Sequence, residues 1–183
     1  DHSSPESLIG GKLGVDCSGA EIEDRGLKTL SEEILLATLQ KKQKNIIAIK
    51  SYATNTKNPI LIIGIQKDKQ ALANIKDLEE ALYQYVGIVV FVDYEQNDLL
   101  NPYMLIWRVV NNIDAQRDIK IVEHIIYVDG TKKTAVDGYT REWPEDTDCT
   151  KSVIEDLKNR GLIDIDDKFL HHFQIIGSSP TLL

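Results

Sequence analysis

Hydrophobic positions follow two different periods along this 183-residue chain. Around residues 30–39 they recur every three or four positions, with acids before the stripe and lysines at 41, 42 and 44 after it. This pattern predicts an amphipathic helix capped by Thr29. Residues 67–85 have the same period and predict a second helix. Its apolar stripe consists of Leu72, Ile75, Leu78, Leu82 and Tyr85.

Other hydrophobic positions come in short runs typical of strands. Residues 45–53, 59–66 and 87–94 are such runs, and the last two are continuous enough for a sheet covered on both faces. Asn101 and Pro102 predict the start of a third helix. Residues 118–129 alternate like one further strand, and 148–162 (with Gly161 as C-cap) and 164–177 predict helices. The expected fold is α/β, a three-layer sandwich with a mixed or mostly parallel sheet.

Charge and composition narrow the function classes. The formal net charge of −8 disfavours a nucleic-acid partner, because phosphates would be repelled. No apolar run reaches the roughly 18 residues of a membrane span, and no leader peptide is recognisable. Cys17 and Cys149 lie far apart without a CxxC spacing, which favours a reduced, cytoplasmic setting.

The first residues indicate a piece of a longer protein. The sequence begins at Asp1, its only methionine is Met104, and residues 1–28 are rich in serine, glycine and acids. LGVDCSG at 13–19 resembles IYVDGTK at 126–132, as if a related domain ended there. We therefore expect 1–28 to be the tail segment of a preceding domain, 29–163 an α/β domain, and 164–183 a C-terminal helix and tail.

Motifs of common enzymes and metal sites are weak. GGKLG at 10–14 lacks the flanking strand and helix of a phosphate loop, and 62–70 has one glycine only. His171 and His172 are adjacent, so their side chains diverge on a helix, and His124 has no partner at ligand spacing. No nucleophile elbow or convincing acid/base pair is present. The prediction is no catalytic residue and no metal site.

Two motifs in the second half are more informative. NPYMLIWRVVNNIDAQRD at 101–118 precedes YVDGTKKTAVDGYTREWPED at 127–146. Over roughly residues 86–160 the chain resembles the C-terminal domain of UbiD-type decarboxylases, the 3-octaprenyl-4-hydroxybenzoate carboxy-lyase-like family. The residues that carry the resemblance are Trp107, Arg108, Asn111, Asn112, Asp114, Arg117, Asp118, Asp129, Thr131, Lys132, Lys133, Arg141, Trp143 and Pro144.

The resemblance implies a parent enzyme that removes CO₂ from aromatic or α,β-unsaturated carboxylic acids, as in ubiquinone or menaquinone synthesis. Prenylated FMN serves there as the electron sink. In that family the flavin and a Glu-Arg-Glu group lie in a central domain, of which this sequence has no counterpart. The fragment is therefore expected to bind no cofactor, to be inactive alone, and to serve assembly or cleft closure with the rest of its polypeptide in a homo-oligomer.

The motif residues are accordingly interpreted as structural or interfacial. Arg108, in an apolar helix, needs carboxylates, and Asp114, Asp118 or Asp129 are the candidates. Asn111 and Asn112 would bond carbonyls at the helix end, and Arg117 and Asp118 would brace the next turn. The basic loop with Lys132, Lys133 and Arg141 could also meet an anionic substrate or flavin phosphate. The alternatives are a stand-alone α/β small-molecule-binding module and, last, an enzyme complete within these residues.

Overall fold

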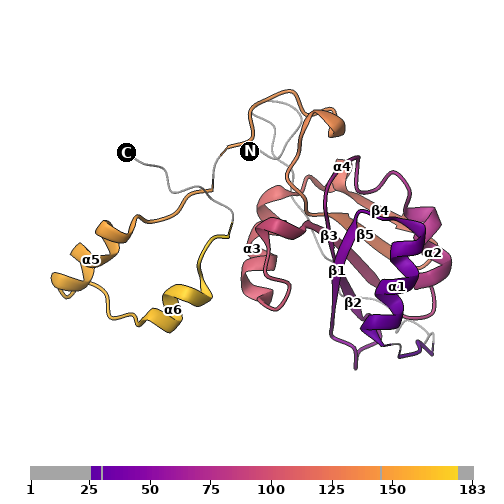
Figure 1. Cartoon of the computed structure of the whole chain (residues 1–183), viewed down its shortest axis with the longest axis horizontal. Coiled ribbons are helices and arrows are strands. Elements are labelled where there is room, and N and C mark those ends of the chain that lie inside the picture. The colour runs from indigo at the N-terminus through magenta and orange to yellow at the C-terminus, as the bar shows by residue number, and fades with distance from the viewer. Residues whose placement is uncertain (1–25, 30, 145, 177–183) are drawn as a thin grey trace, which may run out of the picture.

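A mixed five-stranded sheet forms the centre of the protein (Figure 1). The computed structural model describes residues 26–29, 31–144 and 146–176. The strands are β1 (Ile46–Tyr52), β2 (Ile60–Ile65), β3 (Ile88–Asp93), β4 (Ile119–Val122) and β5 (Ile125–Asp129), in the order β1-β2-β3-β5-β4. β2, β3 and β5 are parallel, and both edge strands are antiparallel to their neighbours. The predicted α/β class and mixed sheet are confirmed.

Helices cover both faces of this sheet, as the continuous apolar runs of β2 and β3 require. α1 (Glu32–Lys42) and α2 (Ile75–Leu82) lie on one face, and α3 (Pro102–Asn112) lies on the other (Figure 1). Successive side chains of a strand point to opposite faces. Ile63 accordingly joins the core under α1 and α2, while Ile62 joins a smaller cluster with Leu105 of α3.

Three predicted elements differ from those observed. α1 begins after Ser31 rather than Thr29. The helix expected over 67–85 is limited to α2, because bonds from Lys67 to the loop after β5 hold the chain in turns beyond β2. The single strand expected over 118–129 is a hairpin of β4 and β5, in which Glu123 takes a φ of 50°. Its two-residue turn contains no Asn or Gly, the usual hairpin signal.

Three short helices connect the strands. η1 (Tyr94–Gln96) and η2 (Ala135–Asp137) are 3-10 helices that follow β3 and β5, and α4 (Ala115–Asp118) leads into β4.

The C-terminal part is helical, as predicted, but lies beside the sheet rather than on it. It contains α5 (Lys151–Asn159) and α6 (Asp167–His172). Gly161, at φ 65°, follows α5 as predicted. Figure 1 shows α5 and α6 standing apart from the strands. The predicted tail 1–28 falls almost wholly outside the described residues. Among the helices that the structure does describe, none is long and apolar enough to cross a membrane.

Candidate functional site

The carboxyl ends of the three parallel strands bring charged side chains to one edge of the sheet. Lys67 follows β2, Asp93 ends β3 and Asp129 ends β5. In parallel sheets this edge is where ligands commonly bind, because loops and backbone dipoles converge there. Here, however, the loop 129–137 folds back over the edge and engages these charges itself.

Lys133 is the centre of this charge network and its side chain is 0% exposed. Its Nζ lies 3.0 Å from Asp129 Oδ1 and 3.4 Å from Asp118 Oδ1. It also donates to the carbonyl oxygens of Asp129 (2.7 Å) and Thr131 (2.9 Å). A buried ammonium is tolerated only with such compensation. Lys133 Nζ is therefore engaged by four protein oxygens, and contact of the basic loop with an anionic substrate or a flavin phosphate stays a prediction.

Lys67 joins β2 to the same loop. Its Nζ donates to Thr131 Oγ1 (2.7 Å), to the Lys132 carbonyl (2.8 Å) and to Asp137 Oδ2 (2.7 Å). Asp137 Oδ2 also accepts from the backbone N–H of Thr134, which closes a capping box at η2. The loop is therefore fixed at both of its ends by buried lysines.

A second group of motif residues lies at the end of α3. Asn112 donates its amide to the Gly130 carbonyl at 2.9 Å. A Cβ on Gly130 would lie 2.7 Å from Val109, so only glycine allows the helix this close to the loop. Asn111 bonds the Trp107 carbonyl inside its own helix.

The turn after α3 is held by two aspartates and an arginine. Arg117 forms a bidentate pair with Asp118, at 2.8 and 2.7 Å. Asp118 accepts from the backbone N–H of Asp114, whose own carboxylate caps α4. This geometry is what a brace between α3 and β4 would need, and it places Asp118 between Arg117 and Lys133.

The two strand-end carboxylates have opposite pKa shifts. Burial would raise the pKa of Asp129, but the charges of Lys133 and Lys67 outweigh burial and the pKa is lowered. For Asp93 burial prevails, and its pKa is raised although the Lys132 N–H donates to it at 2.7 Å and Lys67 opposes the shift. Asp93 is the half-buried carboxylate of the edge, and the neighbouring Asp129 charge adds to its shift.

Arg108 contacts none of the three aspartates expected to pair with it. Its NH1 lies 2.8 Å from Asp146 Oδ2 and 3.5 Å from Gln96 Oε1, and its NH2 donates to the Ile176 carbonyl at 3.2 Å. Asn112, one turn later, is the α3 residue that reaches the strand ends. Arg108 lies too early in the helix for that edge, and the guanidinium turns toward the C-terminal segment instead, 5.8 Å from the Trp107 ring centroid.

The remaining motif residues form an aromatic group after η2. Tyr139 and Trp143 pack edge-on with ring centroids 5.1 Å apart, and the Arg141 guanidinium lies 5.4 Å from the Tyr139 ring. Lys132 contributes chiefly its backbone, through its N–H to Asp93 and its carbonyl to Lys67.

Sequence reasoning missed three residues of the network, namely Lys67, Asp93 and Asp137. Two signals were readable. Thr134 and Asp137 have the spacing of a capping box. Asp93 ends an apolar strand run at the expected ligand edge. The position of Lys67, at the start of an expected helix, concealed its role because exposed lysines are common there.

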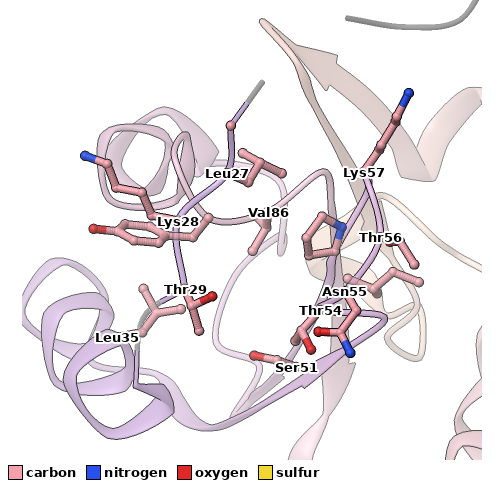
Figure 2. A pocket seen from close by; sticks show the side chains of 14 residues that line it. Leu27, Lys28, Thr29, Leu35, Ser51, Thr54, Asn55, Thr56, Lys57 and Val86 are labelled. Carbon is pink, nitrogen blue, oxygen red and sulfur yellow. The ribbon is translucent and has the colours of Figure 1, made fainter. Parts of the chain in front are cut away.

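A cavity of about 350 Å³ lies at the opposite end of β2, away from the network (Figure 2). Leu35, Ile60 and Val86 supply apolar walls, while hydroxyl and amide groups come from the 51–56 region. The amino groups of Lys28 and Lys57 point away from its centre in Figure 2. None of the family-motif residues lines it. Within the described residues, no cluster of three or more His, Cys, Asp or Glu could hold a metal ion.

Comparison with known proteins identifies the domain. The family profile described as "3-octaprenyl-4-hydroxybenzoate carboxy-lyase C-terminal domain" matches residues 27–154, and so includes the whole charge network. Uncharacterised proteins from Helicobacter pylori strains 26695 and J99 are each 42% identical over 182 residues, or 99% of this chain. The chain spans about 29% of the length of these relatives.

Solved structures show the same fold at low sequence identity. An evolved dimeric form of the UbiD-class enzyme HmfF from Pelotomaculum thermopropionicum, in complex with prFMN, matches with a TM-score of 0.52 and 19% identity, over 68% of this chain and 28% of that one. The vanillic acid decarboxylase of Sedimentibacter hydroxybenzoicus in closed form matches with a TM-score of 0.51 and 16% identity, over 70% and 31%. An open form of the latter, with a truncated ShVdcD, gives a TM-score of 0.50 and 17% identity over 70% and 31%.

Proposed function

Since this chain belongs to the family of 3-octaprenyl-4-hydroxybenzoate carboxy-lyase C-terminal domains, we propose that it is the C-terminal part of a UbiD-like decarboxylase. The parent would use prenylated FMN to release CO₂ from aromatic or α,β-unsaturated acids of the ubiquinone or menaquinone type. Residues 29–163 would form the domain, with 1–28 belonging to a preceding domain and 164–183 appended. A cytoplasmic location belongs to the same proposal.

Within that parent, we assign this domain an assembly or cleft-closing role and place catalysis in a part of the parent outside this chain. The charge network supports this division, because Lys133 and Lys67 are directed at protein oxygens rather than into an open site. The motif residues other than Pro144 would then be structural or interfacial. Among the described residues, the cavity at the other end of β2 favours the alternative of a stand-alone small-molecule-binding module, since its volume suits a small ligand.

The observation that supports the assembly role is the exposed apolar surface on the outer face of α3. Tyr103, Ile106 and Val110 recur at helical spacing on α3, and Leu100 precedes the helix. All four are 59–71% exposed, although the opposite side of the helix already packs on the sheet. A contiguous exposed apolar surface on a helix that already packs on a sheet usually marks an interaction site. On β4 and β5, Ile121 and its cross-strand partner Ile126 are exposed as well.

We assign a second copy of the parent protein as the occupant of this face. Two findings support a contact within an assembly of the parent over an uncovered face of an isolated domain. The relatives are about three times longer than this chain, so most of the parent lies beyond it, and one structural neighbour is a dimeric form. The open and closed forms of another neighbour support motion about such a domain.

The test uses the full-length parent carrying Ile106→Glu, with Ile34→Glu on α1 as the matched control. Both residues are exposed isoleucines on helices, at 64% and 57%. Analytical ultracentrifugation and CO₂ release from aromatic acids are measured with prenylated FMN supplied. Ile106→Glu is expected to lower the oligomer order and the activity together, while Ile34→Glu leaves both unchanged. Normal assembly of Ile106→Glu would refute the interface, and a parent that releases no CO₂ would refute the decarboxylase assignment.

A further inference from the structure

One guanidinium holds two points of the chain that are thirty residues apart. Arg108 NH1 binds Asp146 before α5, and NH2 binds the Ile176 carbonyl after α6. The segment between these points leaves α3 and returns to the same side chain. We call residues 147–175 the C-terminal strap.

Among the residues that the structure describes, little else attaches the strap to the sheet and its helices. Neither α5 nor α6 contains a buried residue, and Figure 1 shows both helices away from the sheet. In 147–175 the buried side chain is Ile175, next to the Arg108 contact. Apolar side chains such as Val153, Leu162 and Phe169 remain 46–58% exposed. α5 and α6 therefore have N-terminal capping hydrogen bonds of their own but bury little surface against the rest of the described structure.

The additional contacts of the strap also go to α3. Asn101 donates its amide to the His172 carbonyl at 2.5 Å. The Tyr103 ring lies edge-on to His172, with centroids 5.3 Å apart, and 6.3 Å from Phe173. Among the described residues, the polar and aromatic docking contacts of the strap thus come from Asn101, the N-cap of α3, and from Tyr103 and Arg108 within α3. The far end of the segment lies beyond the family match at 154.

From these contacts we infer that residues 147–175 form a strap that opens and closes as one unit on α3. The bonds of Arg108 to Asp146 and to the Ile176 carbonyl hold it closed. Because a single guanidinium binds both ends, loss of its carboxylate partner releases them together. Asp146 is 27% exposed, so the pair is accessible to water and competing ions, unlike the buried Lys133 pairs. Opening separates the Tyr103 ring of α3 from His172 and Phe173.

The test compares two chemically identical substitutions in the whole chain. Asp146→Asn removes the carboxylate from Arg108, whereas Asp156→Asn removes one from the exposed Arg160 pair within α5. Hydrogen exchange and limited proteolysis are followed in the strap and, as the internal reference, in β3 and β5. A change of about 1 kcal/mol, the upper end for a partly exposed ion pair, corresponds to a factor of about 5 in a population. Since cleavage tracks the open population, Asp146→Asn is expected to speed cleavage within 147–175 by roughly that factor, with unchanged exchange in β3 and β5.

Three outcomes decide the inference. It is supported if Asp146→Asn accelerates exchange at both the α5 and the α6 end while Asp156→Asn leaves the α6 end at its wild-type rate. It is overturned if Asp146→Asn behaves as wild type, or if only the end next to Asp146 loosens while the His172–Ile176 end keeps its protection. A second variant, Arg108→Lys, retains the charge but cannot bind both partners at once. It too is expected to loosen the strap. Wild-type protection in this variant would contradict the inference that one guanidinium holds both ends.

Discussion

Lys133 and Arg108 are both buried cations of the family motif, yet their surroundings differ. Lys133 has two carboxylates and two carbonyl oxygens around it, all from residues 118–131 and all buried. Arg108 has one carboxylate, partly exposed, one carbonyl from outside the family match, and the Gln96 amide oxygen at 3.5 Å. Many short bonds to buried partners make a fixed brace, while few bonds to wetter partners make a contact that can be released.

The largest expected effect is that of Lys133→Met. Methionine fills a similar volume but takes the buried ammonium away from Asp118, Asp129 and two carbonyls. Breaking a buried pair in this way costs about 3–5 kcal/mol. The free energy of unfolding is measured by urea denaturation at neutral pH. Lys132→Met is the matched control, because the Lys132 contacts are made by its backbone, and it should stay within about 0.5 kcal/mol of wild type. Equal losses in the two variants would refute the central position of Lys133.

Lys67→Met should have a smaller effect of the same kind. The variant leaves Thr131 Oγ1, the Lys132 carbonyl and Asp137 without one donor each, but Asp137 keeps the Thr134 N–H. Stranding buried polar groups costs about 1–3 kcal/mol. The same denaturation experiment measures it, with the exposed Lys76→Met on α2 as control. A loss as small as that of the control would mean that the loop after β5 holds its conformation without the bond to β2.

Asp93→Asn should change the free energy of unfolding by less than Lys67→Met does, and should raise it rather than lower it. The raised pKa of Asp93 means that its contribution is fully present below its unfolded pKa of about 4 and is lost as the pH rises through the folded value. Asp129, with its lowered pKa, contributes above about pH 4 and loses that contribution as the pH falls through its folded value.

Asparagine can still accept from the Lys132 N–H and removes a charge beside Asp129. Asp93→Asn should therefore be at least as stable as wild type at pH 7, and should keep the loss of stability in acid that Asp129 causes. Unfolding free energies from pH 3 to pH 8 measure both. The difference in unfolding free energy between the variant and wild type should shift in favour of the variant as the pH rises from 5 to 7. A shift in favour of wild type would contradict the raised pKa of Asp93.

Local patterns were sufficient to predict most elements and the family, and the reasons for the failures are physical. The Asn101-Pro102 pair predicted the start of α3. Short apolar runs predicted the buried strands, because the same residues form the core. The hairpin of β4 and β5 was missed because its turn residues, Glu123 and His124, give no turn signal. Charge partners were harder still. Whether Arg108 meets Asp118 or Asp146 depends on the height of Arg108 along α3 and on where a later segment returns, and neither is a local property.

The smallest expected effect on global stability is that of Asp146→Asn. Its carboxylate is 27% exposed and screened by water, so the pair with Arg108 should contribute about 1 kcal/mol or less to unfolding of the sheet. Tm and urea midpoint are compared with those of Lys133→Met and of the double variant. Since the two cations lie in separate contact groups, the two losses should add within about 0.5 kcal/mol. If instead Asp146→Asn costs as much as Lys133→Met, or if the losses fail to add, Arg108 braces the same core as Lys133 and the distinction between a fixed and a releasable contact is wrong.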